Sequence, residues 1–240
     1  MNGVEAVAVL VAVVLACGVS ATVGLGGSLL LVPVAVLALG TKEGVAFAAL
    51  VLAVNNVVKV VAYRDALPVR ASIVVALLTA VGAAAGASLL VAAPERLVDV
   101  GVAVAIVSSL AGERARARRD RLVRGAAVPA LALASGATSG FAGTSGPLKG
   151  VAARALGLDR EHTAGAATLV SLAGDVAKAS VFAEASLLGR DDASVALAAV
   201  PLMIVATVIG RTLNRRMGEQ RYAVVFWAVM TGYVVRIFVG

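Results

Sequence analysis

Apolar stretches long enough to cross a membrane recur along the whole of this 240-residue chain, and they restrict what it can fold into. Of its residues, 60% are hydrophobic and 15% are charged, whereas a soluble domain carries about 25% charged residues. A helix needs roughly 20 mostly apolar residues to cross the hydrocarbon core of a bilayer. We therefore predict an all-α polytopic membrane protein with a single membrane domain over residues 1–240. Its apolar segments are 4–23, 28–39, 44–62, 70–92, 97–111, 125–141, 147–157, 162–183, 193–211 and 222–239.

The two halves of the chain resemble each other. We assign residues 1–111 and 125–240 to two repeats of five segments each, joined by a basic linker at 112–124. Because five is an odd number, the second repeat must be inverted relative to the first. Inverted repeats with interrupted helices near the middle of the membrane are typical of secondary transporters. Shifts of 117 and 119 residues superimpose Gly26 on Gly143, Gly40 on Gly157, Asn56 on Asp175 and Lys59 on Lys178.

Each repeat contains a glycine-rich break followed by a segment that is too short for a straight crossing. The breaks read GLGGSLLLVP (24–33) and SGFAGTSGPLKG (139–150), and we expect half-helices over 28–39 and 147–157. A broken helix exposes unpaired backbone groups, which a membrane tolerates only inside protein or along a cavity. The amino ends of the short helices would then suit an anion. Close helix packing or a tight turn is the alternative. The predicted binding residues here are Gly24, Gly26, Gly27, Ser28, Gly143, Thr144, Ser145 and Gly146.

Two further glycines, Gly82 and Gly86, form a small-xxx-small pattern in segment 70–92. Such a pattern lets two membrane helices approach closely. We predict a packing role for this pair and no role in binding.

Polar residues form a stripe on one face of segment 44–62. Asn55, Asn56 and Lys59 have helical spacings of three and four residues. A lysine at the centre of a membrane helix costs about 2.5–3.5 kcal/mol, so the stripe should face the interior of the bundle. Snorkelling of Lys59 to the membrane surface is the alternative. The equivalent stripe in segment 162–183 contains Thr168, Ser171, Asp175 and Lys178.

The two lysines are expected to differ in role. Lys178 has Asp175 one turn away, whereas Lys59 has only neutral amides nearby on its own helix. We therefore predict Asn55, Asn56, Lys59 and Lys178 as substrate-binding residues, with Lys59 as the counter-charge for an anion. Asp175 is either a static ion-pair partner or a proton carrier. His162 lies at a predicted helix start, where a capping or interfacial role is favoured over proton transfer.

A glycine-rich break followed by a proline, once in each half of a small inverted-repeat membrane protein, resembles the sulfite exporter TauE/SafE family. The similarity extends over nearly the whole chain and is strongest at Gly24, Gly26, Gly27 and Pro33. The resemblance implies transport of small sulfur-containing or organic anions, such as sulfite, sulfonates or related acids. The residues and their spacing imply only an anion.

Taken together, these patterns favour a secondary transporter of small anions that works by alternating access. An anion channel with the same cationic site is the main alternative. An intramembrane enzyme is less favoured, because we find no metal-binding His/Glu cluster, no paired catalytic carboxylates and no Ser/His/Asp set. We expect no enzyme activity, no cofactor and no metal ion.

Arginines gather in two links, 112–124 and 210–221, and their positions predict the orientation. Such basic links stay on the cytoplasmic side of the cell membrane. Because five segments precede the first link and one follows the second, both termini should face outside.

The links also account for the net charge of +7. No basic patch interleaved with aromatic residues is present, so we expect contact with a lipid bilayer and not with nucleic acid.

Overall fold

The chain forms a bundle of helices. The computed structural model describes residues 3–23, 27–116, 127–145 and 147–216, and within these ranges it contains no strand. This confirms the predicted all-α class. The elements are α1 (Gly3–Val23), α2 (Gly27–Leu39), α3 (Thr41–Ala62), the 3₁₀ turn η1 (Arg64–Ala66), α4 (Val69–Ala92), α5 (Glu95–Arg116), α6 (Ala127–Ala142), α7 (Pro147–Arg154), α8 (Arg160–Glu184), α9 (Arg190–Ala198) and α10 (Val200–Arg216). The predicted segment 222–239 lies outside the described residues.

Three of the described helices, α3, α4 and α8, are long and apolar enough to cross a membrane. A fourth crossing results if α9 and α10, which are bent by 44° relative to each other, count as one span. The apolar segment predicted over 193–211 is thus divided by a bend between α9 and α10. Pro201 lies in the first turn of α10, and in a continuous helix its ring would clash with the carbonyl group of Leu197. The chain therefore starts a new helix at Val200.

The two segments expected to be half-helices are short in the structure. α2 has 13 residues and α7 has eight. At 1.5 Å per residue, these helices are about 20 Å and about 12 Å long, which is less than the roughly 30 Å of a hydrocarbon core. Gly40 follows α2 directly and Gly157 lies three residues after the end of α7. Their φ angles are 92° and 68°, in the region that favours glycine.

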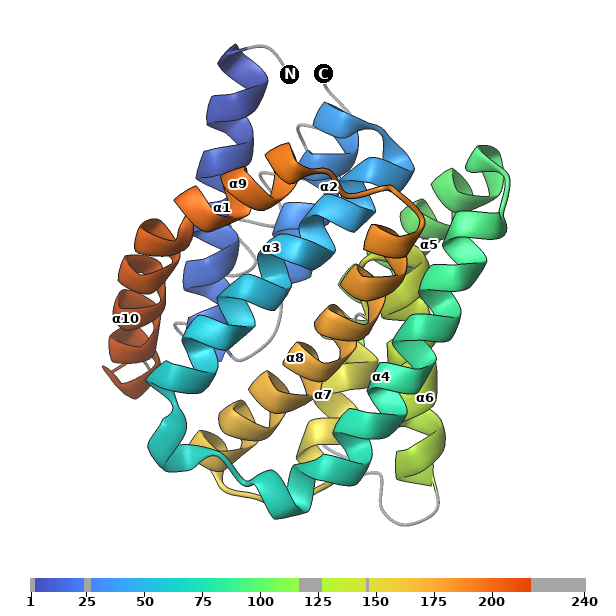
Figure 1. Ribbon diagram of the computed structural model, residues 1–240. Helices are drawn as coiled ribbons and strands as arrows, with labels where there is room; N and C mark the ends of the chain where they lie inside the picture. The colour runs from blue at the N-terminus through green and yellow to red at the C-terminus, as the bar shows by residue number, and fades with distance from the viewer. Residues whose placement is uncertain (1–2, 24–26, 117–126, 146, 217–240) are drawn as a thin grey trace.

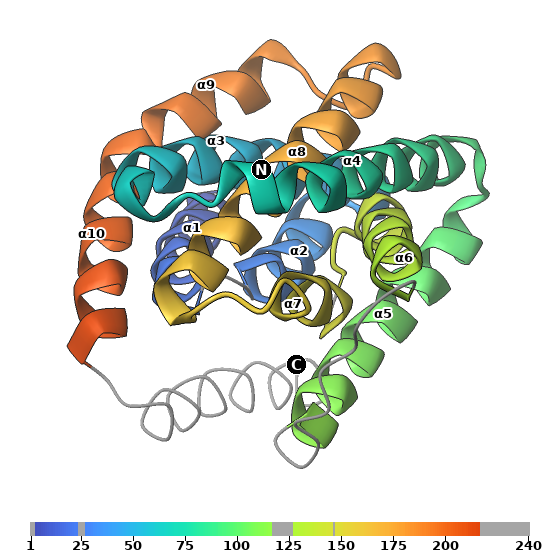
Figure 2. The same ribbon diagram turned by 90° about the horizontal axis from the view of Figure 1, so that it is seen from below.

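Each of the main helix pairs described next joins one helix from each proposed repeat. α3 lies beside α8 across the middle of the bundle (Figure 1). α1 packs against α10, and α6 packs against α4. The first helix of each proposed repeat therefore contacts the fourth segment of the other. Seen from below, α1, α2, α7 and α6 follow one another on one side of α3, α8 and α4 (Figure 2). Intertwined inverted repeats would produce this pairing, and the division into repeats stays a prediction.

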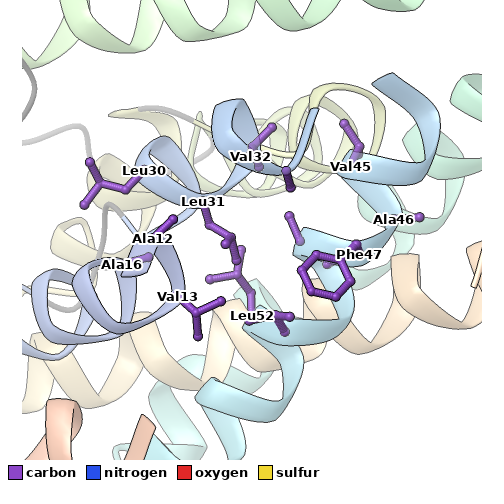
Figure 3. Packing of buried hydrophobic residues seen from close by; sticks show 14 of the residues in the cluster. Ala12, Val13, Ala16, Leu30, Leu31, Val32, Val45, Ala46, Phe47 and Leu52 are labelled. Atoms are coloured by element: carbon purple, nitrogen blue, oxygen red, sulfur yellow. The ribbon is translucent and has the colours of Figure 1, made fainter. Parts of the chain in front are cut away.

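Apolar side chains fill the space between α1, α2 and α3 (Figure 3). Large apolar side chains also cover the outer faces of the bundle, for example Leu77 and Val81 of α4, which are 61% and 63% exposed. Exterior and interior are therefore both apolar, as a lipid environment requires, and any buried polar group stands out. The labelled core residues are Ala12, Val13, Ala16, Leu30, Leu31, Val32, Val45, Ala46, Phe47 and Leu52.

Glycines bring α4 and α6 into backbone contact. A Cβ atom added at Gly82 would lie 2.2 Å from the Leu133 carbonyl oxygen, and one added at Gly86 would lie 2.1 Å from that of Ala137. α6 contributes Gly136 and Gly140, where an added Cβ would lie 2.1 Å from a carbonyl oxygen of α4. The predicted packing role of Gly82 and Gly86 is confirmed.

The orientation in the membrane stays a prediction, and cysteine labelling tests it. The native Cys17 is buried, so its background labelling should be low. In intact cells, a membrane-impermeant thiol reagent should label Gly189→Cys, at an exposed position before α9, and should not label Gly112→Cys in α5. Permeabilised cells supply the control, because both positions should then react. The reverse pattern, or labelling of both sites from outside, would contradict the orientation.

Candidate functional site

The polar stripes of α3 and α8 meet at the middle of the bundle. The Asn56 side chain donates a hydrogen bond of 2.7 Å from its Nδ2 to Oδ2 of Asp175, and these two residues are 119 positions apart. Lys59 and Lys178 are both fully buried. Both stripes therefore face the interior, as predicted, and Lys59 does not snorkel to the surface.

Each buried lysine binds a serine from the first helix of its own proposed repeat. Lys59 Nζ donates to Ser20 Oγ at 3.0 Å, and Lys178 Nζ donates to Ser139 Oγ at 3.0 Å. Each serine precedes its lysine by 39 residues, so the two contacts are equivalent. We had not predicted either serine as a site residue. The same shift of 119 that pairs the lysines also pairs Ser20 with Ser139, and it could have identified them.

The two lysines differ in the charge of their other partners. Lys178 Nζ lies 2.8 Å from Asp175 Oδ1, which confirms the predicted ion pair. Lys59 Nζ donates instead to Asn56 Oδ1 at 3.2 Å, so its hydrogen-bond partners are neutral. The residues form one continuous buried chain in the order Ser20, Lys59, Asn56, Asp175, Lys178 and Ser139. This chain, which we call the lysine chain, contains two ammonium groups and one carboxylate.

A third lysine lies close to the lysine chain. Lys149 is only 8% exposed on α7, which packs against α8, the helix that carries Asp175 and Lys178. It is close enough for its charge to interact with those of Lys59, Asp175 and Lys178. We had not predicted this residue. Its signal in the sequence is a single lysine near the end of the second break, two residues after Pro147.

The two glycine breaks touch each other. Ser28 at the start of α2 donates a hydrogen bond of 3.3 Å to Oγ1 of Thr144, which is buried beside the buried Ser145. Gly143 has a φ angle of 73°, and a Cβ atom there would lie 2.8 Å from a methyl group of Val32. The second break therefore packs directly on α2. Gly24, Gly26 and Gly146 lie outside the described residues.

The first break also packs against the lysine chain. A Cβ atom added at Gly27 would lie 2.9 Å from both the Ala16 carbonyl oxygen and the Cβ atom of Ser20. Ser20 in turn accepts the hydrogen bond from Lys59. Any side chain larger than hydrogen at position 27 would therefore displace a group that holds Lys59.

Asn55 lies against a different helix from its neighbours in the stripe. Its Oδ1 accepts a hydrogen bond of 3.4 Å from Thr207 of α10. Within the described ranges, its buried Nδ2 has no partner. The structure thus brings Asn56, Lys59, Asp175 and Lys178 together and places Asn55 beside them, toward α10.

His162 is exposed in the first turn of α8. Its backbone amide donates to Asp159 Oδ1 at 3.0 Å, and its Nδ1 lies 2.6 Å from Asp159 Oδ2. These hydrogen bonds, chiefly the one from the backbone amide, hold the pKa of Asp159 below its usual value. Asp159 is therefore the cap residue of α8, and His162 is its partner in the first turn, at an exposed position. In the part of the chain that the structure describes, no three His, Cys, Asp or Glu side chains are grouped as metal ligands would be.

Comparison with known proteins gives one match. The chain matches the family described as Sulfite exporter TauE/SafE over residues 9–237. It belongs to this family. No curated protein and no solved structure matches it. The TauE/SafE family implies a membrane transporter of sulfite-like anions, which confirms the resemblance seen at the glycine breaks and, with the apolar helices, an integral membrane protein.

The arrangement in this TauE/SafE protein suits an oxyanion in two respects. Ammonium groups supply N–H donors and positive charge, and hydroxyl groups can donate to anionic oxygens. Lys59 and Lys149 supply the ammonium groups. Ser28, Thr144 and Ser145 supply the hydroxyl groups. An excess of positive charge in an apolar interior is unfavourable by about 2.5–3.5 kcal/mol per cation unless a counter-ion is present.

Proposed function

We propose that this TauE/SafE protein is a secondary transporter of small anions, either sulfur-containing or organic, such as sulfite or sulfonates. The observation that carries the proposal is Lys59, a fully buried cation whose hydrogen-bond partners, Ser20 and Asn56, are both neutral. A structural lysine would be expected to contact a carboxylate directly, as Lys178 does. A bound anion would supply the missing charge.

The proposed site lies between the lysine chain and the two glycine breaks. Lys59 is the counter-charge, and Ser28, Thr144 and Ser145 donate hydrogen bonds to the oxygen atoms of the anion. The glycines of both breaks, including Gly27 and Gly143, allow the backbone to approach closely. Lys178 and Asp175 neutralise each other and hold Asn56 in place. Two hydrogen-bonding partners for Asp175 support a static ion pair over a proton carrier.

Movement of one repeat against the other would open the site to each side of the membrane in turn. The contact between α3 and α8 would then separate or slide, because these helices come from different repeats and meet through the Asn56–Asp175 hydrogen bond. In this scheme the protein lies in the cell membrane with both termini outside. It moves its substrate without chemical change, so it is no enzyme.

A thermal-shift screen of the purified protein tests anion binding. Sulfite, sulfate, thiosulfate, sulfonates and small carboxylates, all as sodium salts at equal ionic strength, should separate into anions that raise the melting temperature and anions that do not. Stabilisation by sodium chloride at the same ionic strength sets the baseline. If no anion raises the melting temperature above that baseline, the binding proposal is wrong.

A counterflow experiment separates the transporter from the channel. Vesicles loaded with an unlabelled stabilising anion should accumulate the labelled anion transiently from outside. Exchange through alternating access couples the two fluxes, whereas a channel lets both anions run down their gradients. Uptake that does not depend on the internal anion would support the channel.

A further inference from the structure

We propose that the site takes an anion with two negative charges, and that Lys149 supplies the second positive charge for it. The inference rests on the proposed function and specifies its substrate class. It is carried by the number and placement of buried charges around the lysine chain.

Lys149 adds a cation that the ion pair does not neutralise. Its side chain is more than nine-tenths buried, and among the described residues no hydrogen bond or ion pair of its ammonium group is found. Among the residues that the structure describes, the one carboxylate near it is that of Asp175, which already binds Lys178 and accepts a hydrogen bond from Asn56. Three ammonium groups and one carboxylate therefore leave two positive charges uncompensated.

The position of Lys149 on its helix makes its uncompensated positive charge more unfavourable. It is the third residue of α7, which begins at Pro147. The amino end of a helix has a partial positive charge, so it favours anions and disfavours cations. Both the burial of the Lys149 ammonium group and the partial positive charge at this end of α7 therefore favour a bound anion.

Lys149 also departs from the repeat pattern. The shift of 117 that superimposes the two breaks places Lys149 on Val32, a fully buried apolar residue of α2. The two lysines of the lysine chain, Lys59 and Lys178, occupy equivalent positions. The repeat architecture therefore does not require Lys149, which leaves charge on the ligand as the reason for its presence.

A ligand with one negative charge would leave one of the two cations uncompensated in an apolar interior. A ligand with two would neutralise both. This class includes the fully ionised forms of sulfite, sulfate and thiosulfate, and sulfonates that carry a carboxylate. The side chains around the site, with ammonium and hydroxyl donors, match oxygen atoms on such anions.

Calorimetry with matched probes tests the inference. Sulfoacetate and isethionate have similar skeletons, but sulfoacetate carries two negative charges and isethionate carries one. Sulfate, with two charges, and methanesulfonate, with one, form a second pair. At constant ionic strength and pH 8, the purified full chain should bind the divalent member of each pair about 30-fold more tightly. Lys149→Met should remove most of this preference by weakening divalent binding about 30-fold while changing monovalent binding less than about threefold. Lys149→Arg should keep the preference.

Two controls keep the test decisive. Lys42→Met removes a lysine whose ammonium group donates to the Val91 carbonyl at 3.0 Å, and it should change neither affinity. Lys149→Gln is a second neutral variant if the methionine protein folds poorly. Equal binding of both probe charges by the wild type would overturn the inference and leave the anion site intact. Equal loss of both probes in Lys149→Met would also overturn it. If no probe binds to the wild type, the proposed function fails as well.

Discussion

Lys59→Met should weaken anion binding by about 30-fold or more while leaving the stability of the unliganded protein nearly unchanged. The loss of affinity follows because Lys59 is the proposed counter-charge and is fully buried. The small change in stability follows from two opposed terms. Removing a buried cation from an apolar interior relieves about 2.5–3.5 kcal/mol. Leaving Asn56 Oδ1 without its donor costs about 1–3 kcal/mol.

Lys178→Met should behave differently. Its ammonium group forms an ion pair of 2.8 Å with Asp175, and both side chains are buried. Removing one partner of a buried pair strands the other charge and costs about 3–5 kcal/mol. The unliganded Lys178→Met protein should therefore melt well below the wild type unless Asp175 takes up a proton.

Melting temperature and anion affinity, measured for both variants in the same detergent, separate the two roles. Lys42→Met is the matched control, since it removes a lysine outside the lysine chain and should change neither quantity. Normal anion binding by Lys59→Met would refute its role as counter-charge. A stable Lys178→Met protein with an ionised Asp175 would show that the ion pair does little for the fold.

Gly86→Ala should lower the free energy of unfolding by about 3 kcal/mol, although alanine is the better helix former. The added Cβ atom would lie 2.1 Å from the Ala137 carbonyl oxygen, which is backbone and cannot rotate away. α4 and α6 would have to separate along their whole contact. Because packing is the main force that joins membrane helices, that separation removes a large part of the stability.

Gly18→Ala is the matched control for this prediction. Gly18 lies on α1, which packs against α10, and an added Cβ there would lie 3.9 Å from the Ala206 carbonyl oxygen. That distance is an ordinary contact, so the variant should be neutral or more stable by up to about 1 kcal/mol from helix propensity. Thermal unfolding of both variants in one detergent gives the comparison. If Gly86→Ala is as stable as Gly18→Ala, the close approach of α4 and α6 is wrong.

Much of the architecture could be predicted from the chain alone, because a bilayer leaves few choices. Backbone groups in hydrocarbon must be satisfied within the segment, so a long apolar run forms a helix. Charged side chains are also unfavourable in hydrocarbon, so Lys59 and Lys178 face the interior of the bundle. The spacing of three residues on one helix places Lys178 beside Asp175. The short α2 and α7 were also predictable, because glycine and proline mark their ends.

The partners of the buried lysines depended on the tertiary structure. Helical periodicity determines which face of its own helix a residue occupies, but not which helix lies opposite that face. Ser20 meets Lys59, and Asn55 meets Thr207, only because α1 and α10 pack beside α3. Lys149 lies near the lysine chain because α7 packs against α6 and α8. Contacts between residues so distant along the chain are set by how whole helices pack, and packing depends on the shapes of many side chains at once.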